Sequence, residues 1–192
     1  MKFIYPEGAT PLESDELAAL IPKHITTQDQ LNAWEQQNIL LAQQWARGKK
    51  DIMSVAFIQQ LHKHMFGDTW KWAGKFRHSG KNIGIDWHLI PEELKKLCDD
   101  GMYQCEHHSF SDDEIAVRFH HRLVWIHPFP NGNGRHARLM ADLLIMQLGH
   151  SRFSWGIHQD LSRTTPVRKQ YIEALRSADK GDYEQLVAFA RS

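Results

Sequence analysis

The chain has 192 residues, 42% of them hydrophobic and 24% charged, a composition typical of a globular protein that builds its own core. Lysine plus arginine and aspartate plus glutamate number 23 each, so the formal net charge is zero. This balance excludes a protein drawn to nucleic acid or membranes by a large overall charge. The sequence has only two cysteines, no apolar run long enough to cross a bilayer and no secretory signal. It therefore predicts a cytoplasmic protein in a reducing compartment.

Three helices are predicted in the first third of the chain. Thr10-Pro11-Leu12-Glu13 combines a capping box with proline at the first helical position, which predicts a short helix to about Leu20. A second capping box, Thr27 to Gln30, opens a helix over 27–47, and apolar spacing predicts a third helix over 54–66.

Residues 68–90 differ from their surroundings, because tryptophan and glycine are frequent and helical spacing is absent. Lys75-Phe76-Arg77-His78 and Asn82-Ile83-Gly84-Ile85 predict two short strands that pair across Ser79-Gly80 as a β-hairpin.

Five more helices are predicted after this hairpin, opening near Pro91, Ser111, Gly132, Thr165 and Asp182. The predicted class is therefore all-α, with about eight helices and one small β-hairpin. We expect residues 1–25 to form an N-terminal segment with a short helix, and residues 26–192 to form a single helical domain.

The stretch HPFPNGNGR, residues 127–135, breaks the chain between two strongly helical patterns. Its glycines allow positive φ angles and close approach of a ligand, and the first amides of the following helix lack intrahelical partners. Such a helix start binds anions, and Arg135 and Arg138 lie near the same helical face at its first turn. His127 faces the same region and can act as a general base, so an oligophosphate is the expected ligand. No phosphate-binding P-loop signature occurs.

The sequence HPFPNGNGRHAR resembles the Fic/Doc family signature His-x-Phe-x-Asp/Glu-Gly-Asn-Gly-Arg-x-x-Arg. The chain as a whole looks most like the small standalone members called the mobile mystery protein B group, with the similarity running from about Thr26 to the C-terminus. The resemblance implies a Fic-like helical fold and a protein adenylyltransferase. Such an enzyme transfers AMP from ATP, with Mg²⁺, to a serine, threonine or tyrosine hydroxyl of a target protein, possibly of the chain itself.

The resemblance also implies a role for each residue of the signature. His127 is the base that activates the target hydroxyl, and Phe129 anchors the loop in the core. The implied phosphate-binding residues are Gly132, Asn133, Gly134, Arg135 and Arg138.

Position 131 departs from the family pattern, because Asn131 stands where the Mg²⁺-binding carboxylate is usual. An amide oxygen carries no charge, so we expect a weak metal ligand, with ATP supplying most ligands, or slow or absent AMP transfer.

The predicted hairpin lies where Fic proteins carry a flap that pairs with the target as an added strand. The alternative is a surface hairpin that only closes the helical core. The expected target-docking residues are Lys75, Phe76, Arg77, Ile83 and Ile85.

Glu35 is the nearest match to the glutamate of the family's inhibitory helix, although both flanking positions depart from that pattern. The alternatives are a solvated glutamate and an inhibitory Glu35–Arg138 ion pair. The histidines form no zinc-binding spacing. The rival functions are transfer of phosphate, UMP or phosphocholine, and a nucleotide-binding regulatory module without catalysis. The resemblance also hints at a toxin–antitoxin-like setting with a small DNA-binding partner protein.

Overall fold

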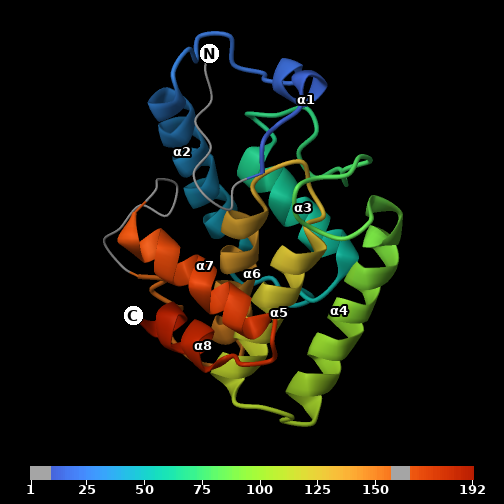
Figure 1. The fold of residues 1–192 in the computed structure, drawn as a ribbon, viewed down its shortest axis with the longest axis vertical. Coiled ribbons are helices and arrows are strands. Elements are labelled where there is room, and N and C mark those ends of the chain that lie inside the picture. Colours follow the sequence, from blue (N-terminus) through green and yellow to red (C-terminus); the bar gives the residue numbers. More distant parts are fainter. Residues whose placement is uncertain (1–9, 157–164) are drawn as a thin grey trace.

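A computed structural model describes residues 10–156 and 165–192 and has the all-α architecture that the sequence predicts (Figure 1). The helices of the described residues are α1 (Ser14–Ala18), α2 (Gln28–Ala46), α3 (Val55–Phe66), α4 (Ile90–Glu106), α5 (Asp112–Ile126), α6 (Asn133–Gln147), α7 (Pro166–Ala178) and α8 (Glu184–Arg191). A 3₁₀ turn, η1 (Trp87–Leu89), precedes α4. None of the helices in these two ranges is long and apolar enough to cross a bilayer.

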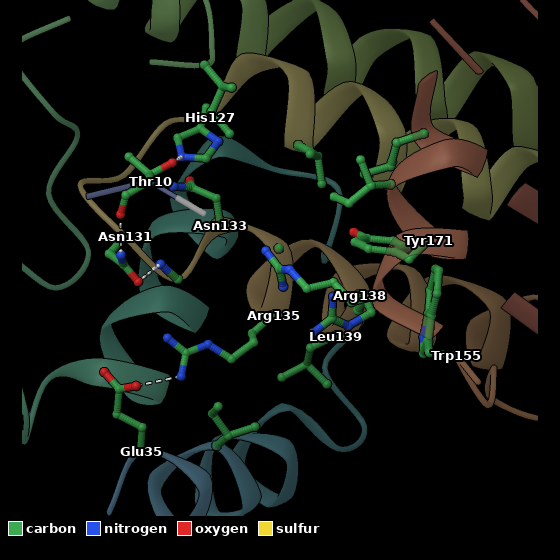
Figure 2. Close-up of a pocket in the computed structure, with 18 of the residues that line it drawn as sticks. Thr10, Glu35, His127, Asn131, Asn133, Arg135, Arg138, Leu139, Trp155 and Tyr171 are labelled. Atoms are coloured by element: carbon green, nitrogen blue, oxygen red, sulfur yellow. Dashed lines mark hydrogen bonds and ion pairs between the residues drawn. The ribbon is translucent and has the colours of Figure 1, made fainter. Parts of the chain in front are cut away.

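The first helix begins later than the sequence predicts, because its cap is Glu13 and not Thr10. The Glu13 side chain accepts a hydrogen bond from the backbone amide of Glu16, and the Glu16 carboxylate accepts one from the backbone amide of Glu13. Thr10 instead places its hydroxyl against His127, 117 positions further along the chain (Figure 2). A tertiary contact has therefore replaced the predicted local cap.

The predicted β-hairpin over residues 75–85 is wrong, since this stretch is a loop without strands. The Arg77 amide donates to Pro128 O, and the Arg77 guanidinium donates to the carbonyls of Ser79 and Ile85. The polar groups that would form a hairpin ladder are thus bound by one arginine and by the loop that follows α5. Among the described residues the one β-bridge is isolated and joins Leu20 to Trp70.

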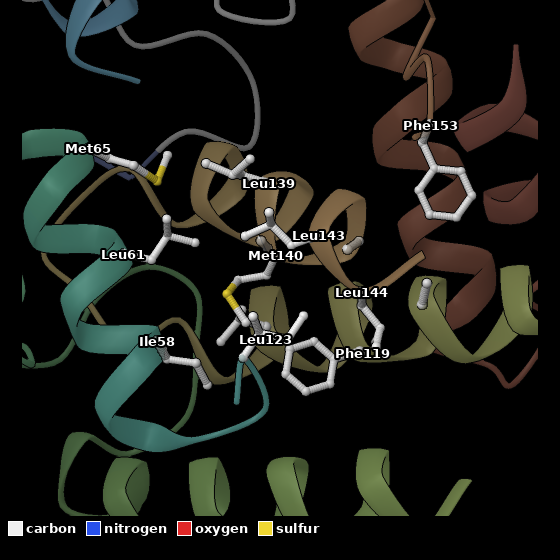
Figure 3. Close-up of a cluster of buried hydrophobic side chains, with 14 of the residues drawn as sticks. Ile58, Leu61, Met65, Phe119, Leu123, Leu139, Met140, Leu143, Leu144 and Phe153 are labelled. Carbon is white, nitrogen blue, oxygen red and sulfur yellow. The ribbon is translucent and has the colours of Figure 1, made fainter. Parts of the chain in front are cut away.

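The core is built around α5 and α6, which make the most extensive helix–helix contact of the described structure. Apolar side chains of α3 pack against the same pair from one side (Figure 3). The labelled members of this cluster that are almost fully buried are Ile58, Leu61, Met65, Phe119, Leu123, Met140, Leu144 and Phe153. The short loop between α5 and α6 therefore connects two immobilised helices, which fixes its position.

Candidate active site

His127 forms the C-terminal cap of α5 in the left-handed conformation, with φ 54° and ψ 60°. Its backbone amide still donates to Leu123 O at 3.1 Å, so the helix ends directly at this residue. The left-handed cap turns the imidazole toward the N-terminal segment, where Nε2 lies 2.9 Å from Thr10 Oγ1. Such a conformation is unusual outside glycine and marks a residue held by its surroundings.

Asn133 closes the loop on itself. Its side-chain oxygen accepts from the Phe129 amide at 3.0 Å, and its Nδ2 donates to Phe129 O at 2.8 Å. Phe129 is fully buried and stacks on the ring of His62, with centroids 3.7 Å apart. His62 also bonds Asn131 O through Nε2 at 3.0 Å. The Asn133 side chain therefore shapes the loop, and only the backbone of this residue remains to bind a ligand.

The N-terminus of α6 and its two arginines lie along one wall of a cavity of about 1220 Å³. Gly132, with φ 80°, precedes the first free amides of α6, and a Cβ there would lie 2.7 Å from the Phe66 ring. Arg138 lies over the ring of Tyr171 (Figure 2). The cavity thus combines unpaired amides, two guanidinium groups and an imidazole, the groups that bind a phosphate chain and accept a proton.

Arg77 is 2% exposed and holds the end of α5 in place. Its Nε donates to His127 O at 2.6 Å, and one of its terminal nitrogens also reaches Ile126 O at 3.4 Å. These carbonyls carry the negative end of the helix dipole, so a buried cation stabilises them. The target-docking role expected of Arg77 stays a prediction, and in the structure its buried guanidinium is bonded to the backbone at His127.

The pKa of His127 falls to about 4, mainly because burial removes the imidazolium from water. The positive charges of Arg77 and Lys81 lower this pKa further, and the Val124 carbonyl opposes the shift. His127 is therefore neutral near pH 7 and able to accept a proton. A phosphate chain nearby would raise the pKa toward the working pH, because its negative charge favours imidazolium.

Asn131 does not present a free oxygen to a metal. Its Oδ1 accepts from the Gly132 amide at 2.7 Å, and its Nδ2 donates to Thr10 O at 3.0 Å. Nowhere in residues 10–156 or 165–192 do histidine, cysteine or acidic side chains cluster as a metal site. The residues present fit a protein-bound Mg²⁺ poorly.

Glu35 is 4% exposed and pairs with Arg135, with Oε2 and Nη1 2.5 Å apart. Its other oxygen accepts from Trp70 Nε1 at 2.7 Å. The inhibitory hypothesis expected an ion pair between Glu35 and Arg138. The structure instead pairs Glu35 with Arg135. The solvated alternative is also wrong, because this carboxylate is buried beside the α6 N-terminus (Figure 2).

The expected target-docking residues divide into two groups. Ile83 and Ile85 line the cavity, and Ile83 is 37% exposed. Lys75 is exposed away from the cavity lining, while Phe76 packs toward Phe129, with ring centroids 5.9 Å apart.

Sequence reasoning missed Thr10, His62 and Lys81 as parts of the site. The Lys81 ammonium is buried between Glu13 and Glu16, at 3.3 and 2.6 Å, and so fastens the N-terminal segment to the loop over residues 75–86. The only signal in the sequence was the side-chain chemistry of these residues, because their partners lie far away along the chain.

Comparison with known proteins gives the same family as the signature. The model of the Fic/DOC family matches residues 52–145. The protein adenylyltransferase Fic of Nematostella vectensis is 28% identical over 149 residues, covering 73% of this chain and 32% of the relative. That of Drosophila grimshawi is 30% identical over 161 residues, covering 79% of this chain and 29% of the relative. The chain thus spans about a third of the length of these relatives.

Solved structures with the same fold come from animals and bacteria. Fic-1 of C. elegans (residues 134–508) superposes with a TM-score of 0.68 at 22% identity, covering 91% of this chain and 51% of that one. The BepC protein of Bartonella tribocorum, solved with bound AMPPNP, gives a TM-score of 0.67 at 19% identity and covers 93% and 97% of the two chains. Since family match, fold and signature geometry agree, this chain carries a Fic/DOC family domain.

Proposed function

We propose that the chain is a protein adenylyltransferase that transfers AMP from ATP to a serine, threonine or tyrosine hydroxyl of a target protein. The observation that carries the proposal is that His127 Nε2 lies 2.9 Å from a hydroxyl oxygen, that of Thr10. Both residues line the cavity that also contains the α6 N-terminus and two arginines. The adenylyltransferase relatives and the AMPPNP bound to BepC support ATP as the donor.

The proposed reaction uses His127 to accept the proton of the acceptor hydroxyl as its oxygen attacks the α-phosphorus of ATP. Pyrophosphate leaves, and AMP remains on the acceptor oxygen. The amides that open α6 and the guanidinium groups of Arg135 and Arg138 bind the phosphate oxygens, whose charge grows in the transition state. Mg²⁺ would have to take its ligands from phosphates and water, so no step is assigned to a protein-bound ion.

Glu35 is proposed to restrain this reaction. Its carboxylate pairs with Arg135 and places a negative charge where phosphates must bind. ATP therefore has to compete with an internal anion, and removal of this anion should increase transfer.

The test is transfer of AMP from ATP labelled at the α-phosphate, with the full chain and a mixture of candidate target proteins. We expect labelled protein with wild type, more label with Glu35→Gly, and none with His127→Ala. Label that persists in His127→Ala would contradict the assigned base. The mass added to the modified protein separates AMP from phosphate, UMP or phosphocholine.

One observation favours the second candidate, a nucleotide-binding regulatory module without catalysis. Both polar ends of the Asn131 side chain are already hydrogen-bonded, so position 131 supplies no charge for a metal. Binding of ATP without any transfer, in both wild type and Glu35→Gly, would favour this candidate.

A further inference from the structure

We propose that Thr10 is a self-modification site: its hydroxyl accepts AMP from ATP within the same chain, with His127 as the base. This inference rests on the proposed AMP transfer and adds the acceptor residue. It assigns a role to the N-terminal segment, which lies outside the region that the family model matches.

The position of the Thr10 hydroxyl is that of an acceptor. Thr10 Oγ1 lies 2.9 Å from His127 Nε2, which is hydrogen-bonding distance for transfer of its proton to a neutral imidazole. Figure 2 shows Thr10 between His127 and Asn131 at the edge of the cavity. Thr10 lines the same cavity as Arg135 and Arg138, the two arginines proposed to bind the phosphate chain.

Thr10 is held in this position by its backbone as well as by its side chain. Asn131 Nδ2 donates to Thr10 O at 3.0 Å, and the residue is 5% exposed. Because the cap of α1 is Glu13, the Thr10 hydroxyl takes no part in that helix and faces His127.

The segment that follows Thr10 is fastened to the domain at further points. Lys81 bonds Glu13 and Glu16, and Trp72 Nε1 donates to Glu16 O at 3.1 Å. Ser79 Oγ donates to Glu13 Oε1 at 3.3 Å. Contacts at several points of the fold therefore fix the placement of Thr10 and keep its hydroxyl at hydrogen-bonding distance from the proposed base.

In the proposed step the Thr10 oxygen forms a bond to the α-phosphorus of ATP while the bond from that phosphorus to the bridging oxygen of the β-phosphate breaks. The hydroxyl proton passes to His127 Nε2, and the electron pair of the broken bond leaves with pyrophosphate. The products are Thr10-linked AMP and pyrophosphate, with no oxidation or reduction.

The experiment follows modification of the full chain by ATP and Mg²⁺, using intact mass and peptide mapping. Wild type, Thr10→Ser, Thr10→Val and the control Thr26→Val are compared, each also in the Glu35→Gly background. Valine keeps the shape of threonine without the hydroxyl, and Thr26 is an exposed threonine outside the cavity lining. His127→Ala, which lacks the proposed base, serves as the negative control.

We expect one AMP on Thr10 in wild type and Thr26→Val, one AMP on Ser at position 10 in Thr10→Ser, and complete loss at this position in Thr10→Val. The first-order rate should not change with protein concentration over a hundredfold range, because acceptor and base share one chain. AMP that maps elsewhere and is unaffected by Thr10→Val would overturn the inference, as would a rate proportional to protein concentration.

Failure of the inference can be separated from failure of the proposed function. If Thr10 stays unmodified in both backgrounds while target proteins receive AMP in a His127-dependent reaction, the inference fails and the function stands. If no protein receives AMP in either background, both fail.

Discussion

At the scale of single residues, Gly84 contacts His127 so closely that a side chain at position 84 has no room. Its φ is +97°, and an added Cβ would lie 2.6 Å from His127 Cβ and 2.9 Å from the Arg77 guanidinium. We expect Gly84→Ala to lower the free energy of unfolding by about 1–3 kcal/mol and to displace His127, so that the proposed AMP transfer falls further than stability alone explains.

Gly80→Ala is the matched control for this prediction. Gly80 lies in the same loop, and an added Cβ there would meet nothing within 4 Å. Its effect on the free energy of unfolding, measured by urea denaturation, should stay within about 0.5 kcal/mol. Equal effects of the two substitutions would mean that the loop does not press on His127.

Asn131 acts as donor and acceptor at once, and an aspartate cannot do both at neutral pH. Asn131→Asp would set a carboxylate against Thr10 O and lose the hydrogen bond to it. We expect this change to loosen the N-terminal segment, seen as faster limited proteolysis near Thr10, and to make AMP transfer more strongly dependent on Mg²⁺. The exposed variant Gln37→Glu adds the same charge elsewhere on the surface. Unchanged metal dependence in Asn131→Asp would show that position 131 does not ligate the metal.

At the scale of helices, α2 and α6 are joined by the buried Glu35–Arg135 pair. Glu35→Gln removes the internal anion while keeping an acceptor for Trp70, so Arg135 becomes available to phosphate. We expect ATP to bind about tenfold more tightly, which corresponds to about 1.4 kcal/mol, as measured by calorimetry. Glu106→Gln, an exposed change at the end of α4, should leave the affinity unchanged. Weaker ATP binding by Glu35→Gln would show that Glu35 organises Arg135 for binding instead of opposing it.

The helices were predictable from the sequence because their signals are local. Thr27 caps α2, Ser54 caps α3 and Ser111 caps α5 through their own side chains, as the capping residues and apolar spacing indicate. The hairpin was not predictable, since its glycines and alternating residues fit a turn but the buried Arg77 binds the carbonyls that a ladder would use. The predicted helix cap at Thr10 was wrong for a similar reason, because the Thr10 hydroxyl contacts the distant His127.

At the scale of the whole molecule, four buried histidines of the part of the chain that the structure describes have a lowered pKa and are therefore neutral near pH 7. Burial is the main cause that lowers the pKa of each: to about 4 for His127, to about 3 for His136, and well below 6.5 for His62 and His120. The unfolded chain therefore binds more protons than the folded chain once the pH falls below about 6.5. Stability should be complete above that pH and decrease toward pH 4.

The Asp142 carboxyl group opposes this loss of stability at low pH. Burial raises the pKa of Asp142 to about 6, so the folded chain holds one extra proton between the ordinary value near 3.8 and pH 6. The balance remains in favour of the histidines, and we expect the free energy of unfolding to drop by roughly 3–5 kcal/mol from pH 6.5 to pH 5. Urea denaturation at both pH values measures it.

His136→Gln tests the origin of this pH dependence. Loss of one buried histidine should reduce the dependence of the free energy of unfolding on pH by the equivalent of one proton. A pH slope that is identical in His136→Gln and wild type would contradict the assignment.

The signature of the candidate site was readable from sequence, but its surroundings were not. His127, Arg135 and Arg138 come together because they lie on two consecutive helices and their loop. Other parts of the cavity lining come from Thr10, Glu35 and helix α7, which lie outside residues 52–145. Spacing within the chain carries no information about such contacts, because tertiary packing alone brings these segments together.

Under the proposed AMP transfer, the contact between Thr10 and His127 also affects how tightly an outside target protein can bind. The Thr10 hydroxyl and the hydroxyl of a target would both need His127 Nε2, so they would compete for one atom. The Thr10 hydroxyl is present at an effective concentration of about millimolar or more. A target would have to displace the Thr10 hydroxyl, and its apparent affinity would be reduced by the fraction of chains in which His127 is already occupied. If the proposed function holds, the N-terminal segment would therefore favour tight-binding targets over abundant weak ones.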